Sequence, residues 1–144
     1  MAGFKGSFKY AVDQKGRINI PAKFRKTTGA LETYTITRGL NGCLYVYPTE
    51  EWDIIEGKLR TLLRNDPTNL YYLRATLSNA ADVQLDRQGR ITVPANLIKM
   101  AGLGKEVLVN GALDRMEIWD PERFAKYIEE SVEQYEEVAR KILI

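Results

Sequence analysis

The sequence predicts an α+β protein in which two copies of one structural unit share a core. With 144 residues, the chain has the length of one domain or of two very small halves. A ten-residue segment that begins at Asp13 returns at Asp86, and six of its ten positions are identical. Strand-like alternation follows in each copy, and a longer stretch with helical spacing follows the strands. Two units are too few for a stacked repeat protein, so we expect a pseudo-symmetric pair.

Each copy opens with a predicted turn and a short strand. Asp13 and Gly16 occupy the first and fourth positions of a type I turn, where the carboxylate accepts backbone N–H groups and glycine tolerates the exit conformation. Asp86 and Gly89 repeat this pattern. Polar and apolar residues then alternate over 17–20 and 90–93, which predicts half-buried strands with inward aliphatic side chains.

A short helix is predicted after each of these strands. Pro21 and Pro94 suit the first helical position, and Gly29 and Gly102 suit the helix ends. Two further strands are expected in each copy, at residues 34–38, 44–47, 106–110 and 116–119. Between the first two, the pair at positions 41 and 42, Asn-Gly, predicts a tight turn.

A longer helix is predicted at the end of each copy. The first begins at Pro48 with Thr49 as its cap and ends before Asp66-Pro67, with an apolar stripe of Trp52, Ile55, Leu59 and Leu62. The second begins at Asp120-Pro121, with a stripe of Phe124, Ile128, Tyr135 and Ile142. This second stripe packs either on its own barrel or on another subunit. The expected domains are repeat 1 at 7–50, a helical connection at 51–78, repeat 2 at 80–123 and a C-terminal helix at 124–144.

The composition argues against most enzyme classes. The chain has no histidine and one cysteine, which excludes a Ser-His-Asp triad, a Cys-His dyad and an intrachain disulfide. Cys43 is expected to be a buried strand residue without an activated thiol. The repeated aspartates, Asp13 and Asp86, fit structural caps better than catalytic groups. We therefore expect no enzyme, metal site, cofactor or small-molecule substrate, and the absence of a long apolar run or secretory signal predicts a soluble intracellular protein.

Charge is distributed unevenly along the chain. The first 47 residues carry eight Lys and Arg against two acidic residues, whereas residues 120–144 carry four against seven. A basic end and an acidic end suggest that one surface meets an anionic partner, although ordinary variation of a solvated surface would give the same counts.

Arg17 and Arg90 have two interpretations. Each arginine can form an ion pair with the aspartate four residues earlier, which at an exposed site contributes only about 0–1 kcal/mol. Alternatively, the two turns form a duplicated anion-binding edge. The second interpretation is favoured by the basic neighbours, which are Lys9, Lys15, Lys23, Arg25 and Lys26 around the first turn and Arg87 in the second.

The repeated segment also resembles a known family. Asp13, Gly16, Arg17 and Pro21-Ala22, returning as Asp86, Gly89, Arg90 and Pro94-Ala95, resemble the doubled Asp-x-x-x-Arg signature of MraZ, a bacterial regulator family related to the AbrB and SpoVT DNA-binding domains. The similarity continues through residues 44–48 with Trp52 and through residues 114–119, and so covers essentially the whole chain.

The resemblance implies a fold, a partner and an assembly. It implies a tandem AbrB-like swapped-hairpin β-barrel formed by the two repeats, with a helix after each. Subunits of the family form a ring-shaped homo-oligomer and bind double-stranded DNA at short G-rich direct repeats in the promoter of the cell-division and cell-wall gene cluster. A cytoplasmic, nucleoid-associated bacterial protein would follow.

The resemblance also implies roles for single residues. Arg17 and Arg90 would be the principal DNA contacts, and Asp13 and Asp86 would hold the turns. Secondary contacts would come from Lys15, Arg87, Lys9, Lys23 and Gln88. The second copy has Gln88, Asn96 and Ile98 where the first has Lys15, Lys23 and Arg25, so we expect it to contribute less to DNA affinity. The competing hypothesis is a non-enzymatic assembly or interaction module that uses the C-terminal helix.

Overall fold

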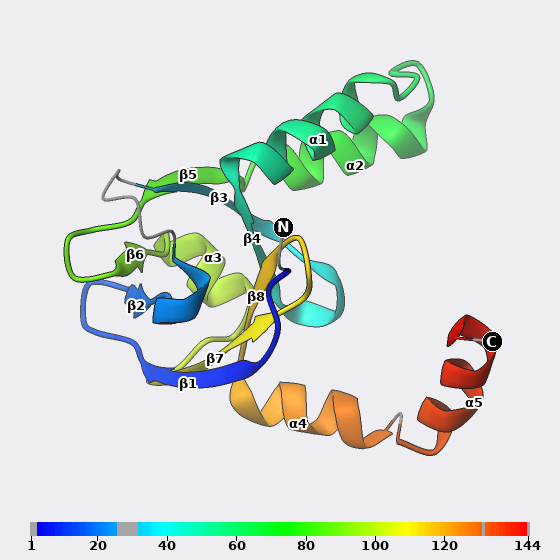
Figure 1. Cartoon of the computed structure of the whole chain (residues 1–144). Helices are drawn as coiled ribbons and strands as arrows, with labels where there is room; N and C mark the ends of the chain where they lie inside the picture. Colours follow the sequence, from blue (N-terminus) through cyan, green and yellow to red (C-terminus); the bar gives the residue numbers. More distant parts are fainter. Residues whose placement is uncertain (1–2, 26–31, 131, 144) are drawn as a thin grey trace.

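The computed structural model describes residues 3–25, 32–130 and 132–143, which form an α+β structure (Figure 1). In chain order its elements are β1 (Ser7–Ala11), β2 (Arg17–Asn19), the 3-10 helix η1 (Ala22–Phe24), β3 (Thr33–Arg38), the 3-10 helix η2 (Leu40–Gly42), β4 (Leu44–Pro48), α1 (Thr49–Arg60), α2 (Pro67–Leu77), β5 (Ala81–Gln84), β6 (Arg90–Thr92), α3 (Ala95–Met100), β7 (Glu106–Gly111), β8 (Met116–Trp119), α4 (Pro121–Glu130) and α5 (Val132–Leu143).

Strand pairing interleaves the two copies. The large sheet is antiparallel with the order β1-β7-β8-β4-β3-β5, and β2 and β6 form a separate antiparallel pair. β1 of the first copy therefore pairs with β7 of the second, while β5 of the second pairs with β3 of the first. Each copy supplies an edge strand to the other, so neither copy completes its sheet alone. β1 and β5 are strands that the sequence pattern did not predict.

One hydrophobic core contains equivalent residues from both copies. Ile18 and Ile91 face each other across the β2–β6 pair and are completely buried. Phe24 and Leu97, which are also related by the repeat, lie in the same cluster. The expectation of a pseudo-symmetric pair with a shared core is confirmed.

The predicted inner strands and turns are confirmed, and two helix starts are corrected. Asn41 and Gly42 have φ values of 62° and 82°, as a tight hairpin turn of type I′ requires. Pro21 and Pro94 lie one residue before their helices rather than at the first helical position, because their ψ values of 135° and 143° continue the extended backbone. Gly102, with φ of 62°, follows α3 as predicted, whereas Gly29 lies outside the described residues.

The long helical stretches are more divided than predicted. Thr49 is the first residue of α1 and not its cap, because its hydroxyl donates to the backbone carbonyl of Thr33. α1 ends at Arg60, before Leu62. Asp66 also starts a second helix, α2, by accepting hydrogen bonds from the first backbone N–H groups of that helix. The expected C-terminal helix is described as α4 (Pro121–Glu130) and α5 (Val132–Leu143), and residue 131 between them lies outside the described residues.

The repeated turns and the long helices occupy different ends of the molecule. Figure 1 shows the β1–β2 and β5–β6 connections together at the left, with α1, α2, α4 and α5 at the right. Within the described ranges, no helix has the length and apolar character needed to cross a bilayer.

Candidate nucleic-acid interface

Both repeated turns are closed by the same hydrogen bonds. Asp13 Oδ1 accepts from the backbone N–H of Lys15 at 3.0 Å and of Arg17 at 2.8 Å. In the second copy, Asp86 Oδ1 accepts from the N–H of Gln88 and of Arg90, both at 2.9 Å. The predicted capped turn is confirmed in both copies.

The same carboxylates also orient the two arginines. Arg17 Nε donates to Asp13 Oδ2 at 2.5 Å, and Arg90 Nε donates to Asp86 Oδ2 at 3.1 Å. The ion pairs expected under the structural interpretation are therefore present. They engage the Nε atom of each guanidinium, which also carries four N–H donors on its two terminal nitrogens. Each arginine is thus held in one orientation without using its full capacity to bind an anion.

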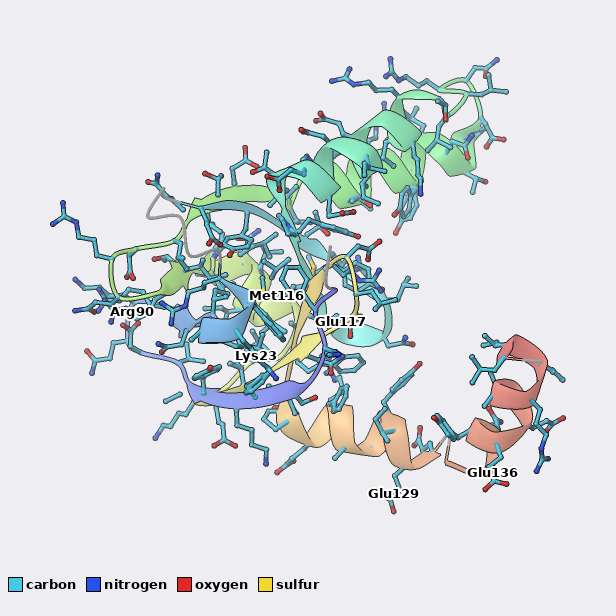
Figure 2. The ribbon with its side chains drawn as sticks, viewed as in Figure 1. Lys23, Arg90, Met116, Glu117, Glu129 and Glu136 are labelled. Atoms are coloured by element: carbon cyan, nitrogen blue, oxygen red, sulfur yellow. The ribbon has the colours of Figure 1, made fainter. Side chains whose placement is uncertain are left out.

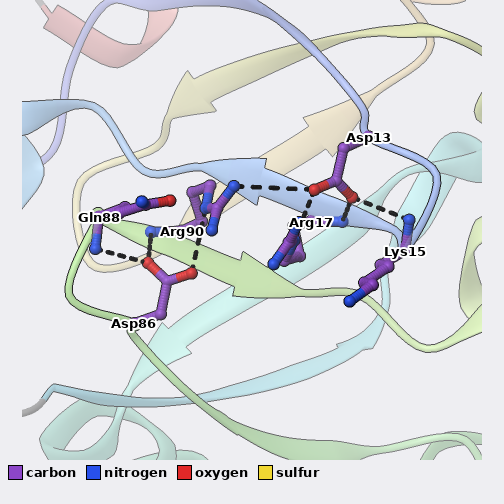
Figure 3. A network of polar contacts seen from close by, with 6 residues as sticks. All are labelled: Asp13, Lys15, Arg17, Asp86, Gln88 and Arg90. Atoms are coloured by element: carbon purple, nitrogen blue, oxygen red, sulfur yellow. Dashed lines mark hydrogen bonds and ion pairs between the residues drawn. The ribbon is translucent and has the colours of Figure 1, made fainter.

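Pairing of β2 with β6 brings the two turns together (Figure 3). Arg90 Nη1 lies 3.8 Å from Asp13 Oδ2 of the other copy. On each side a backbone hydrogen bond of 2.9 Å fixes the neighbouring turn, from the N–H of Ile20 to the carbonyl of Gly89 and from Val93 to Gly16. The two arginines therefore belong to one surface formed by both copies.

The local hydrogen bonds keep both aspartates ionised. The backbone N–H of Arg17 is the main cause that lowers the pKa of Asp13 below its usual value, and the backbone N–H of Arg90 has the same effect on the pKa of Asp86. At neutral pH each carboxylate therefore carries a full charge opposite its arginine.

The interleaved fold exchanges the residues that cover the two turns. Gly16 and Gly89 are buried with φ of 78° and 79°. A Cβ on Gly16 would lie 3.0 Å from Cδ1 of Ile98, whereas a Cβ on Gly89 would overlap the guanidinium of Arg25. Each turn is thus covered by a side chain of the other copy. Ile98, which the repeat alignment placed in the second copy's turn region, therefore lies over the first turn, and the lower DNA affinity expected of the second copy stays a prediction.

Arg25 was expected as a basic neighbour of the first turn and was not among the predicted DNA contacts. Its Nε atom is buried and has no hydrogen-bond partner among the residues that the structure describes. The guanidinium lies beside the second turn, where Gln88 replaces the lysine of the first. The repeat alignment named Arg25, but only strand pairing between the copies could assign it to the second turn.

The remaining predicted residues divide into two groups. Lys15, Arg87 and Gln88 are exposed within the turns, and Lys9 is exposed on β1. Lys23 instead lies with its Nζ 5.0 Å from the centre of the Phe8 ring, and Figure 2 shows it toward the middle of the molecule, apart from Arg90. The structure does not bring Lys23 to the turns. Lys26 lies outside the described residues.

Other reactive groups are few in the described part of the chain. Burial raises the pKa of the Cys43 thiol to about 12, as expected for a thiol that is not activated. No group of three or more cysteine or acidic side chains there could hold a metal ion.

Comparison with known proteins gives one consistent result. A family model described as "MraZ protein, putative antitoxin-like" matches the chain twice, over residues 4–71 and 76–143. A protein named Transcriptional regulator MraZ from Heliobacterium modesticaldum is 44% identical over 140 residues, which are 97% of this chain and 96% of that protein. Proteins of the same name from Natranaerobius thermophilus and Syntrophomonas wolfei are 39% and 40% identical over the same shares of the two chains.

Proposed function

Since the chain belongs to the MraZ family, we propose that it is a transcriptional regulator that binds double-stranded DNA in a sequence-specific way. Its targets are G-rich direct repeats in the promoter of the cell-division and cell-wall gene cluster. The observation that carries this proposal is the joining of two aspartate-held arginines, Arg17 and Arg90, on one surface.

The geometry of the arginines suits guanine. A guanidinium can donate two hydrogen bonds to O6 and N7 of guanine in the major groove, a contact that discriminates by about 1–3 kcal/mol per base pair. Asp13 and Asp86 accept from the Nε atoms and so fix both guanidinium planes before DNA arrives. A side chain that is already oriented loses less conformational entropy on binding.

The exposed cations of the turns suit the DNA backbone. Lys15 and Arg87 flank the arginines and would neutralise phosphates, which position a protein on the duplex without selecting its sequence. One chain offers few such contacts. Several subunits on consecutive direct repeats would multiply them, because each later contact is intramolecular once the first has formed. The proposal therefore includes a ring-shaped homo-oligomer.

The proposal also covers fold details and location. It includes the tandem swapped-hairpin β-barrel and repeats at 7–50 and 80–123, which the pairing of β1 with β7 and of β5 with β3 supports. It assigns no catalytic role, and the engagement of both repeated aspartates with backbone N–H groups and arginine supports this. A cytoplasmic, nucleoid-associated location follows from DNA binding.

Titration of DNA by fluorescence anisotropy tests the proposal. The probe is the DNA duplex immediately upstream of the gene that encodes this chain. The competitor is the same duplex with its G-rich repeats scrambled. Arg17→Ala and Arg90→Ala should each weaken binding by about tenfold or more, the loss expected for one bidentate guanine contact. The matched control is Arg60→Ala, which removes an exposed arginine from α1 and should leave affinity within about twofold.

Two results would contradict the proposal. Unchanged affinity in both turn variants would remove the role assigned to the turns. Equal affinity for the scrambled duplex would show that binding is not sequence-specific. The salt dependence adds a second measure, since each phosphate contact contributes about −0.9 to the slope of log K against log salt.

A further inference from the structure

The two copies differ most in the helices that follow them. In the first copy, Trp52 of α1 packs on Tyr47 of β4, with ring centroids 5.7 Å apart. In the second copy, Phe124 of α4 packs on Trp119 of β8 at 5.2 Å, in the equivalent arrangement. α1 and α4 are therefore counterparts, and both are docked on the sheet of their own chain.

The next helix in each copy behaves differently. α2 runs beside α1, as Figure 1 shows, and together with β4 these two helices border a cavity of about 440 Å³. α5, the helix after α4, stands clear of the sheets in Figure 1. The first copy thus has a groove lined by two helices, and the second has a helix without such packing.

The groove is aromatic and almost uncharged. Its walls include Tyr45 and Tyr47 from β4, Trp52 and Leu59 from α1, and Tyr72 from α2. Tyr72 is 52% exposed although it is large and lines an apolar cavity. Among the described residues that line this groove, Arg38 is the only charged one.

α5 carries an exposed apolar stripe and a small excess of acidic residues, whereas the charged residue that lines the groove is a cation. Tyr135, Val138 and Ile142 are spaced by three and four residues, so they lie on one face of the helix. Tyr135 and Ile142 are 73% and 74% exposed. α5 itself has three acidic residues against two basic ones, and both basic residues pair with glutamates of the same helix. Exposed large apolar side chains in such an arrangement indicate an interaction surface.

We propose that α5 of one copy inserts its apolar stripe into the α1–α2–β4 groove of a second copy of the same chain. This inference rests on the self-assembly that is part of the proposed function, and it names the two surfaces involved. α5, with one more acidic than basic residue, meets a groove whose charged lining residue is the cation Arg38, and aliphatic and aromatic side chains are buried on both sides.

The contact would be heterologous, because the helix and the groove are different surfaces of one chain. Such contacts form a ring where the rotation between copies closes and an open filament where it does not, so the ring of the proposed function requires closure. The helix and the groove both lie away from the turn-bearing end of the molecule in Figure 1. Assembly through these surfaces would therefore leave Arg17 and Arg90 accessible on every subunit.

Oligomeric state, measured by sedimentation velocity without DNA, tests the inference on the full chain. Ile142→Glu places a charge in the helix stripe, and Tyr72→Glu places one in the groove. Each variant should lower the assembled fraction at least about tenfold at a concentration where the unaltered protein is oligomeric. Arg140→Glu on the face of α5 opposite the stripe and Thr68→Glu outside the groove on α2 are the matched controls, and both should assemble normally. Circular dichroism verifies that all four variants are folded.

Mixing the two defective variants gives the decisive result. Tyr72→Glu protein retains an intact α5, and Ile142→Glu protein retains an intact groove. A heterologous contact predicts that the mixture forms a dimer and nothing larger. If Tyr72→Glu protein assembles fully by itself, α5 pairs with another α5 and the inference is wrong. A monomeric unaltered protein would also overturn it. The measurement contains no DNA, so failure of guanine recognition leaves its outcome unaffected.

Discussion

The two repeated turns share one hydrogen-bonding scheme but differ in the groups around it. Arg17 is paired with Asp13 of its own copy, whereas Arg90 is paired with Asp86 and also lies 3.8 Å from Asp13. Arg90 is accordingly the less exposed arginine, at 23% against 32% for Arg17. Under the proposed function, Arg17 is therefore the arginine with the larger exposed surface for a base contact.

The residues that cover the two turns also differ, and here the second turn has the additional positive charge. Ile98 covers the first turn and Arg25 covers the second. The more constrained arginine therefore has an additional cation beside it. A substitution in one copy therefore alters the turn of the other copy, because the covering residues cross the interface between the copies.

Replacing Gly16 or Gly89 with alanine should give the largest losses in the free energy of unfolding. The two losses should differ, because different atoms lie beside the two glycines. Both positions have positive φ, which costs a residue with a Cβ about 1–2 kcal/mol. At Gly16 the new Cβ would also lie 2.9 Å from the carbonyl oxygen of Val93, a backbone atom that cannot move alone. We expect Gly16→Ala to lower the free energy of unfolding by about 1–3 kcal/mol more than Gly89→Ala, as overpacking does.

Urea denaturation measures this difference. At Gly89 the obstacle is the end of the Arg25 side chain, which can turn away. Gly57→Ala is the control, because a Cβ at this position in α1 meets no atom within 4 Å and should stabilise the helix by about 0.5–1 kcal/mol. Equal losses in the free energy of unfolding for Gly16→Ala and Gly89→Ala would contradict the difference between a backbone neighbour at Gly16 and a side-chain neighbour at Gly89.

Local patterns in the sequence predicted most single elements of this fold. The Asp13 turn, the inner strands and the Asn41-Gly42 hairpin each depend on neighbouring residues, and the structure contains all three. The Asp66-Pro67 pair was interpreted only as the end of a helix. It also carries the standard start signal, a capping aspartate before a proline at the first helical position.

The arrangement of the elements could not be predicted in the same way. Ser7–Ala11 and Ala81–Gln84 are edge strands, and what fixes them is pairing with residues about 100 and 50 positions away in the sequence. The same strand pairing places the side chain of Arg25 beside Gly89 and that of Ile98 beside Gly16. A pattern within one copy contains no information about its partner, which is why the repeat alignment assigned these two residues to the wrong turns.

Exchanging the covering residues should give an intermediate effect on DNA binding. Arg25→Ile copies the first turn's cover onto the second and removes one cation, so the slope of log K against log salt should become shallower by about 0.9 if Arg25 contacts a phosphate. Ile98→Arg should make it steeper by a similar amount. Anisotropy titrations from low to physiological salt measure both slopes, with thermal unfolding as a control because Ile98 also packs against the core. Unchanged slopes in both variants would confine Arg25 to a structural role.

Acid sensitivity should give the smallest effect and should have the same sign in the two turns. Asp13 and Asp86 both have a pKa below the unfolded value of about 3.9, so their stabilisation is complete above that pH and is lost as pH falls through the lower folded pKa. Asp13→Asn and Asp86→Asn keep an oxygen acceptor for the backbone N–H groups but remove the charge. Both variants should melt at a lower temperature than the unaltered protein at pH 7, and the gap should narrow toward pH 3. Because solvent screens these partly exposed pairs, we expect shifts of only a few degrees, with the larger one for Asp13, which lies near both arginines. A gap that stays constant from pH 7 to pH 3 would mean that the carboxylate charges do not contribute to holding the turns.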